Sequence, residues 1–335
     1  MSQTLIPRFG QQRKKITVSP DRLVSEHPLV THQKPGIVIQ AELPQLSSAD
    51  WLKQNLDRFD ALLNQHGAVL LRGFQPVGVT DFKPLIESID APPLAYQNRS
   101  TPRSEVSDGV FTSTDYPEDE SIPQHNEMAY TRSWPKRLYF NCVVEPGEGG
   151  QTPIANSANV YNRLPETLRT RFEQHGVMYV RNYRPGMDIP WQQVFQTDDK
   201  AEVARYCDSH QIEHQWLNDH WLRTRQVCQA SIRHHLNDRM LWFNQAHLFH
   251  VSNLPENTRQ ELCKTFADNE LPRNACFGHG QPIDEADLKL IRQAYTEEEA
   301  VFDWQHGDIF VIDNEAVTHG RRPFKQPRQI VVAMT

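Results

Sequence analysis

Two histidines and one glutamate have the types and spacing to hold a metal ion. His125 and Glu127 are separated by one residue, and on a β-strand residues i and i+2 face the same side. His319 follows the run 307–313, which is apolar after an opening Gly-Asp turn and is typical of a strand. Two imidazoles and a carboxylate leave three positions open on one face of Fe(II), where a chelating oxoacid and O2 can bind. The sequence therefore suggests a facial iron site built from distant strands.

The H-x-[DE] motif carries little information by itself. The chain has 15 histidines and 42 acidic residues among 335 positions, so about two matches are expected by chance. Two are found, at His125-x-Glu127 and at His306-x-Asp308. On this pattern alone His125 and His319 could equally be ordinary core or surface histidines, and other residues must decide.

Two further residues fit an oxoacid co-substrate. Thr152 lies 27 residues after His125, and Arg328 lies nine residues after His319. The distal carboxylate of 2-oxoglutarate needs a cation, preferably a guanidinium that grips it with two hydrogen bonds, and a nearby hydroxyl suits the same group. The alternatives are an ordinary turn residue at position 152 and an exposed arginine at a strand end at position 328.

Strand patterns surround the candidate residues, and helical patterns fill other parts of the chain. Short apolar runs predict strands at 68–71, 138–144, 240–243, 301–304, 308–312 and 328–334. Helical periodicity is present over 47–66, where Ser48 is the expected cap, and over 159–176, 200–210, 255–269 and 284–299. Residues 97–124 lack periodicity and are expected to form an ordered loop that leads into the metal motif.

Composition narrows the classes of protein. Hydrophobic residues make up 38% and charged residues 23% of the chain, which is a globular balance, and the net charge of −7 argues against nucleic acid as the main partner. The five cysteines are never spaced C-x-x-C, which argues against a disulfide framework or a cysteine zinc site. No apolar stretch is long enough for a signal peptide or a membrane span. We expect a cytoplasmic protein with no membrane partner.

Taken together, several motifs resemble those of the TauD/TfdA group of Fe(II)/2-oxoglutarate oxygenases. They are His125-x-Glu127, Gly150-Gln151-Thr152, His319-Gly320-Arg321, Arg328 and the early strand 66–74. A closer resemblance is to the SyrP-like branch of this group. It is carried by the segments 98–103 (NRSTPR), 122–130 (IPQHNEMAY), 223–230 (RTRQVCQA), 242–250 (WFNQAHLFH), 271–278 (LPRNACFG) and 307–324. The resemblance covers most of residues 45–335.

The resemblance implies a mainly β fold with helical insertions around a double-stranded β-helix, the jelly-roll of cupin-like proteins. On this basis we expect an N-terminal arm over residues 1–35. Residues 36–335 are then expected to form a single dioxygenase domain, with a helical insertion at about 155–300.

The resemblance also implies roles for individual residues. His125, Glu127 and His319 are implied as ligands of Fe(II), and Thr152 and Arg328 as holders of the C5 carboxylate of 2-oxoglutarate. The implied reaction uses O2 to hydroxylate an unactivated C–H bond of a small molecule in specialised metabolism such as antibiotic biosynthesis. That molecule would be an amino acid or derived from one, free or tethered to a peptidyl carrier protein. Related halogenases lack the carboxylate ligand, so Glu127 favours hydroxylation, while desaturation or cyclisation stays open.

Four residues are candidates for binding the substrate. Asn98, Arg99 and Arg103 belong to the loop before the metal motif, where related enzymes contact substrate, and Arg321 follows His319 by two positions. Arginines at these places would favour an anionic substrate. The alternative is that Arg99 and Arg103 pair with the acidic residues 118–120.

A different class of enzyme is suggested by the segment His210–His214. It matches H-x-x-E-H, the inverted zinc-protease motif, and on a helix His210 and His214 would share a face and could bind zinc with Glu213 as the base. No downstream acidic ligand stands out. Such a hydrolase would need neither 2-oxoglutarate nor O2, whereas the oxygenase needs both.

Overall fold

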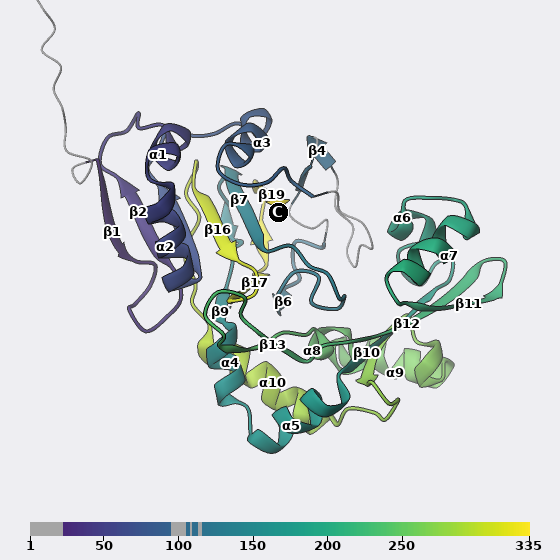
Figure 1. The fold of residues 1–335 in the computed structure, drawn as a ribbon. Helices are drawn as coiled ribbons and strands as arrows, with labels where there is room; N and C mark the ends of the chain where they lie inside the picture. The colour runs from purple at the N-terminus through teal and green to yellow at the C-terminus, as the bar shows by residue number, and fades with distance from the viewer. Residues whose placement is uncertain (1–22, 95–104, 108, 113–115) are drawn as a thin grey trace, which may run out of the picture.

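One wall of the structure is a mainly antiparallel sheet (Figure 1). The computed structural model describes residues 23–94, 105–107, 109–112 and 116–335. In spatial order the strands are β1 (Val24–Pro28), β2 (Ile37–Ala41), β3 (Ala68–Arg72), β16 (Ile309–Asp313), β7 (Arg137–Val144), β19 (Gln329–Met334), β5 (Val110–Thr112) and β4 (Glu105–Ser107). Only β2 and β3 run parallel among these described strands. β1 comes from the expected N-terminal arm and forms the edge of this sheet.

A smaller sheet forms the opposite wall. It consists of β6 (Ile122–His125), β17 (Val317–Arg321) and β9 (Ile154–Asn156), and β8 (Glu148–Gly149) pairs with β18 (Phe324–Lys325) beside it. Buried side chains between the walls include Phe140, Phe310 and Val317. Two sheets that enclose one apolar core agree with the double-stranded β-helix that the family resemblance implied.

Helices cover the outer face of the large sheet. They are α1 (Ser48–Gln54), α2 (Leu56–His66) and α3 (Val79–Glu87). In β3, Val69 and Leu71 pack toward the helices, whereas Ala68 and Leu70 pack into the barrel. Because successive strand residues face opposite sides and both sides are buried, the strand reads as a continuous apolar run. The expected helix over 47–66 is two helices, and Ser47 caps the first in place of Ser48.

The region expected as a helical insertion contains a sheet as well as helices. Its strands are β11 (Glu213–Asn218), β12 (Trp221–Cys228), β10 (Val177–Tyr183) and β15 (Arg273–Phe277), together with the hairpin of β13 (Ser231–Arg233) and β14 (Met240–Trp242). Its helices are α4 (Ser157–Arg163), α5 (Glu166–His175), α6 (Trp191–Phe195), α7 (Lys200–Ser209), α8 (Ala246–Phe249), α9 (Glu256–Thr265) and α10 (Glu285–Glu298). Figure 1 shows the four-stranded sheet set to one side of the barrel, with α6 and α7 at its far end.

Two element predictions near the barrel need correction. The strand expected at 301–304 is absent from a segment that the structure describes in full, and Phe302 and Trp304 instead pack into the barrel core from irregular backbone. The helix expected over 159–176 divides at Leu164, since Pro165 provides no backbone N–H to continue it. Across the described residues, no helix is both long and apolar enough to cross a bilayer.

Candidate metal centre

Strand pairing brings His125 and His319 together. They are direct partners in the antiparallel pairing of β6 with β17, and their ring centroids lie 4.4 Å apart. Directly opposed residues in such a pair project to the same face of the sheet. That face is the barrel interior, where the ring of Phe140 lies 5.4 Å from that of His319.

Glu127 lies beyond the end of β6 and not on the strand, so the expected i, i+2 geometry is wrong. β6 ends at His125, and the next residues turn away from the strand direction. The turn is held by Asn314, whose Oδ1 accepts from the backbone N–H of Glu127 at 2.7 Å. The carboxylate nevertheless reaches the histidines, with Glu127 Oε2 at 3.7 Å from His319 Nε2.

The three side chains fit one metal ion. One ligand atom from each lies within 4.8 Å of the other two. The 3.7 Å between His319 Nε2 and Glu127 Oε2 is below the roughly 4.2 Å that can separate two ligands each about 2.1 Å from a common ion. Nδ1 of His125 lies 2.9 Å from the carbonyl oxygen of Pro123. Since a carbonyl only accepts, Nδ1 carries the proton and donates it, and Nε2 is then the ring nitrogen whose lone pair can bind a metal.

A narrow cavity beside the histidines brings together most of the residues singled out in the sequence. It is lined by Ile122, His125, Phe140, Thr152, His319, Gly320, Arg321, Arg328, Ile330 and Val332. The imidazoles lie on one part of its wall, and Thr152 and the two arginines provide its other polar groups. Its remaining side chains are apolar, which suits the exclusion of water from a reactive centre.

Arg328 lies just before β19 with its guanidinium held at the cavity. Its Nε donates to the carbonyl oxygen of Gly150 at 3.3 Å, and the guanidinium lies 5.2 Å from the Phe324 ring centroid. Burial lowers the pKa of Arg328 to about 10, with a further contribution from neighbouring Arg321, so the side chain is still a cation at neutral pH. Gly150 has φ +69°, and a Cβ there would lie 3.0 Å from Nε of Arg328. Glycine at this position therefore leaves room for the arginine.

Thr152 is buried and already oriented by a neighbour. Its Oγ1 accepts from Nε1–H of Trp304 at 3.1 Å. Because the oxygen takes that proton as acceptor, the threonine's own hydroxyl proton can be donated to an acceptor in the cavity. Sequence patterns had placed Trp304 on a strand, without any link to Thr152.

The candidate substrate residues have mixed outcomes. Asn98, Arg99 and Arg103 lie outside the described residues. Arg321 lines the cavity and is buried, and its guanidinium donates to backbone carbonyls of Tyr116 (3.0 Å) and Glu120 (2.9 Å). These bonds fasten the segment before β6 to β17, so Arg321 has a structural task in addition to its place at the cavity.

The H-x-x-E-H segment does not form a shared face. α7 ends at Ser209, and Gln211 adopts φ +56°, which turns the chain out of the helix. Glu213 and His214 are therefore consecutive residues of β11 and face opposite sides, and Glu213 pairs with Arg225 at 2.6 Å. Among the described residues, this segment supplies no group of three potential metal ligands.

The second H-x-[DE] match is also structural. Asp308 is buried and forms a salt bridge of 2.6 Å with Arg72 of β3. His306 is exposed, and its Nδ1 lies 2.9 Å from the carbonyl oxygen of Val143, to which it donates. His306 and Asp308 thus fix the turn before β16, and neither residue lines the cavity at His125 and His319.

A second group of potential ligands, His234, His235 and Glu315, is occupied by internal bonds. Nε2 of His234 lies 2.8 Å from the Asp313 carboxylate, and its Nδ1 accepts from the backbone N–H of Leu236. The Glu315 carboxylate accepts from His235, Trp134 and Lys136. Burial raises the pKa of Glu315, but these bonds outweigh it and lower that pKa to about 2. The group therefore ties the β13–β14 hairpin to the turn between β16 and β17.

This tie predicts a pH dependence of stability. The hydrogen bond to Asp313 raises the pKa of His234 above its ordinary value, although burial opposes it. The stability that the His234–Asp313 hydrogen bond contributes is then fully present below the pKa of about 6.5 that histidine has in the unfolded chain. It is lost as pH rises through the higher pKa of His234 in the folded protein. We expect the free energy of unfolding of the wild type to exceed that of His234→Gln most at low pH, with the difference shrinking as pH rises. Urea unfolding across this range measures the difference. Oδ1 of Asp313 also accepts from the backbone N–H groups of Glu315 and Ala316. Asp313→Asn keeps that oxygen but removes the charge, so it should abolish the trend.

Three buried residues that hold the ligand segment were missed in the sequence. Gln245 donates from Nε2 to the carbonyl oxygen of Asn126, and Nε2 of His247 lies 3.0 Å from the carbonyl oxygen of Gln124. Burial lowers the pKa of His247 to about 3, so it is neutral and its Nε2 proton is donated to that carbonyl. Asn314 is the third. Nothing in their spacing marks these residues, since they come from the insertion and from a turn.

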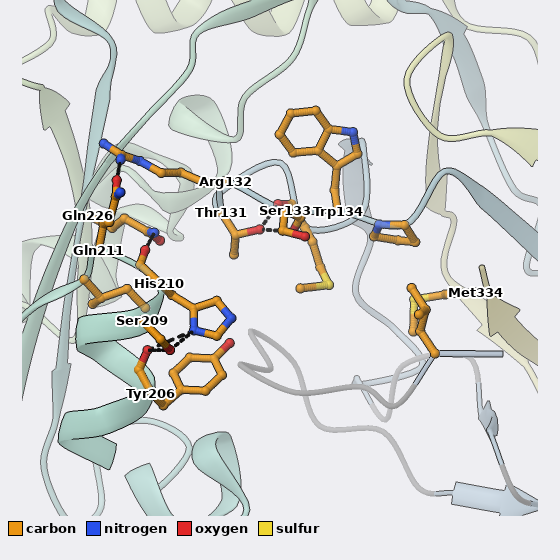
Figure 2. A pocket seen from close by; sticks show the side chains of 14 residues that line it. Thr131, Arg132, Ser133, Trp134, Tyr206, Ser209, His210, Gln211, Gln226 and Met334 are labelled. Carbon is orange, nitrogen blue, oxygen red and sulfur yellow. Dashed lines mark hydrogen bonds between the residues drawn. The ribbon is translucent and has the colours of Figure 1, made fainter. Parts of the chain in front are cut away.

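A wider groove of about 410 Å³ lies next to the turn that carries Glu127. Figure 2 shows Tyr206, Ser209 and His210 on one side of it, with Thr131, Ser133 and Trp134 across from them. Met128 and Met334 also line it and both pack against the barrel core. Met334 continues the row of β19 residues, Ile330 and Val332, that line the cavity at the histidines.

The chain matches known oxygenases along most of its length. Residues 28–335 match the model of the taurine catabolism dioxygenase TauD, TfdA family. The dapdiamide synthesis protein DdaC of Enterobacter agglomerans is 40% identical over 275 residues, which cover 82% of this chain and 84% of that protein. A clavaminate synthase-like protein of Arabidopsis thaliana is 34% identical over 296 residues, covering 84% and 86% of the two chains.

Solved structures show the same fold at low identity. PvcB of Pseudomonas aeruginosa superposes with a TM-score of 0.55 at 14% identity, covering 97% of this chain and 94% of that one. AAD-2, solved with Mn(II) and N-oxalylglycine, gives a TM-score of 0.53 at 12% identity, covering 93% and 96%.

Proposed function

From its membership of the TauD, TfdA family, which makes this chain an Fe(II)- and 2-oxoglutarate-dependent oxygenase, we propose that it hydroxylates an unactivated C–H bond of an amino acid or amino-acid-derived molecule. The observation that carries this proposal is the single cavity that presents both imidazoles together with Thr152 and Arg328. The two imidazoles of this cavity suit a metal ion, and the Thr152 hydroxyl and the Arg328 guanidinium suit a carboxylate. We place the chain in the SyrP-like branch on the segments that resemble it.

In this proposal His125, Glu127 and His319 hold the iron, and Thr152 and Arg328 hold the C5 carboxylate of 2-oxoglutarate. Bound iron and 2-oxoglutarate supply the oxidising chemistry: O2 delivers one oxygen atom to succinate, formed with CO2, and one to the C–H bond, which becomes C–OH. The protein orients these groups. Arg328 provides a fixed positive charge and Thr152 a directed hydroxyl. Both act at the end of the co-substrate remote from the metal.

The proposed substrate class rests on the relatives and on the groove. DdaC is named for dapdiamide synthesis, and the structure of PvcB is described as that of an oxygenase from an isonitrile synthetic pathway. Both names point to small molecules of specialised metabolism. The groove beside the Glu127 turn falls within the roughly 300–1,000 Å³ of ligand pockets and mixes apolar walls with hydroxyl and imidazole groups. An amino-acid-like substrate, free or on a peptidyl carrier protein, matches that lining. Asn98, Arg99, Arg103 and Arg321 remain its proposed contacts.

Succinate formation tests the proposed function. Purified protein with Fe(II), 2-oxoglutarate and O2 is offered free amino acids, short peptides and aminoacyl carrier proteins, and products are analysed by mass spectrometry. We expect one class to stimulate succinate formation and to gain one oxygen atom. Loss of two hydrogens without added oxygen would mean desaturation or cyclisation. Stimulation only by sulfonates or aryloxy acids would contradict the proposed substrate class.

A matched pair of variants tests the role of Thr152. Thr152→Val keeps the shape but removes the hydroxyl, whereas Thr152→Ser keeps the hydroxyl. A hydrogen bond to a charged group contributes about 1.5–3 kcal/mol, so Thr152→Val is expected to weaken 2-oxoglutarate binding about 10- to 150-fold. Anaerobic titration of the Fe(II) protein with 2-oxoglutarate measures it. Equal weakening in both variants would show that packing, not the hydroxyl, is what Thr152 contributes.

A further inference from the structure

Asn314 stands out because its contacts converge on the turn that carries Glu127. It is completely buried in the turn between β16 and β17. Its Oδ1 accepts from the backbone N–H of Glu127 at 2.7 Å, and its Nδ2 donates to the Glu127 carbonyl oxygen at 3.0 Å. The same Nδ2 also donates to the carbonyl oxygen of Pro135 at 2.8 Å. One side-chain amide thus pairs with both backbone polar groups of a single residue.

This pairing replaces strand pairing that Glu127 lacks. The register of β6 with β17 includes the His125–His319 pair but does not reach Glu127. A residue beyond the end of a strand has no neighbouring backbone to fix its N–H and C=O groups, and buried backbone groups need partners. The Asn314 amide offers the donor and the acceptor that an adjacent strand would offer.

The backbone of Asn314 is fixed as well. Its N–H donates to the carbonyl oxygen of Lys136 at 2.9 Å, and its own carbonyl oxygen accepts from Nδ2 of Asn126 at 2.6 Å. Five residues later the same chain reaches His319 on β17. Asn314 therefore connects Glu127 to the segment that carries His319. Oε2 of Glu127 lies 3.7 Å from Nε2 of His319.

We propose that Asn314 is a positioning residue that sets the Glu127 carboxylate against His319 and so determines the affinity of the centre for its metal. The inference rests on the proposed role of Glu127 as a ligand. The group that Asn314 serves is a divalent metal ion, and Asn314 acts on it only through the Glu127 backbone. Outer partners of metal ligands typically change metal affinity by about 10- to 100-fold when they are removed.

The neighbouring Glu315 provides the control. It is buried in the same turn and is bonded to Lys136, Trp134 and His235, but it makes no hydrogen bond to Glu127. A variant at Glu315 should therefore loosen the turn without changing the groups that face Glu127. Asn314→Asp is the sharpest test variant, because it keeps the shape and the Oδ1 acceptor but places an oxygen against the carbonyls of Glu127 and Pro135. Asn314→Ser is a smaller replacement in case the aspartate variant does not fold.

The experiment measures metal affinity and stability together. Fe(II) and Co(II) binding to full-length wild type, Asn314→Asp, Asn314→Ser, Glu315→Gln and Glu127→Gln are followed by anaerobic calorimetry, with Tm recorded without metal. We expect the Asn314 variants to bind metal about 10- to 100-fold more weakly than wild type, and Glu315→Gln to lose Tm while its metal Kd changes less than about two-fold. Wild-type affinity in both folded Asn314 variants would overturn the inference, as would a loss in Glu315→Gln equal to theirs. Absence of metal binding by the wild type, or full binding by Glu127→Gln, would instead refute the proposed metal centre.

Discussion

The His319→Ala variant is expected to bind Fe(II) more than about 100-fold more weakly than the wild type and to lose 2-oxoglutarate turnover. Loss of an outer partner alone costs about 10- to 100-fold in affinity, so loss of a ligand should exceed that range. His319 is the central member of the site, since it pairs with His125 across the strands and lies 3.7 Å from Glu127. Anaerobic calorimetry with Fe(II) measures the affinity, and succinate formation measures the turnover.

Two histidines outside the centre serve as controls for this prediction. His306 belongs to the other H-x-[DE] match, and His210 begins the H-x-x-E-H segment; both are exposed. His306→Ala and His210→Ala should keep wild-type metal affinity. If His210→Ala lost the metal while His319→Ala kept it, the iron centre would be wrong and the zinc hydrolase would become the better account.

The Arg328→Ala variant is expected to bind 2-oxoglutarate about 30-fold to several thousand-fold more weakly, with a much smaller effect on Fe(II) binding. Removing one partner of a buried charge pair costs about 2–5 kcal/mol, and the C5 carboxylate would lose its main cation. Because the metal would still chelate the other end, KM for 2-oxoglutarate should rise more than kcat falls. Arg328→Lys should fall between wild type and alanine, since an ammonium keeps the charge but not the planar two-point grip.

A nearby arginine provides the control for Arg328. Arg322 is exposed and pairs with Glu299 at 2.6 Å, away from the cavity lining. Arg322→Ala should bind 2-oxoglutarate as the wild type does. Unchanged 2-oxoglutarate affinity in Arg328→Ala would contradict the assignment and would direct attention to Arg321, which lines the same cavity.

The sequence predicted those parts of the site that depend on regular strands. β16 follows from its apolar run and Gly-Asp turn, and a strand before His125 was expected from the motif. His319 was expected on a distant strand, but the bounds of that strand, β17, were not predicted. Regular antiparallel pairing then brought His125 opposite His319. The cavity position of Arg328 also follows from a strand start that the apolar run 328–334 marks. The double-stranded β-helix was implied by the family resemblance and agrees with the two facing sheets.

The parts that were missed depend on irregular backbone and on buried polar groups. Glu127 was placed on a strand, but β6 ends at His125, and the Asn314 amide holds Glu127 in the turn that follows. β10 and β12 escaped detection because they bury polar residues such as Asn182 and Thr224, which break the apolar run that marks a buried strand. The hydrogen bond from Trp304 to Thr152 joins residues 152 positions apart on non-repetitive backbone. Such contacts have no periodic signature in the sequence.

The most direct test of the central claim is the visible spectrum of the anaerobic protein. Fe(II) and 2-oxoglutarate are added to the metal-free protein without substrate or O2, with Glu127→Gln and His319→Ala measured beside it. A 2-oxoglutarate chelate on iron held by two histidines and a carboxylate predicts a weak metal-to-ligand charge-transfer band in the wild type that is absent from His319→Ala. A folded wild-type protein that binds Fe(II) but shows no such band, or an equal band in His319→Ala, would contradict the account.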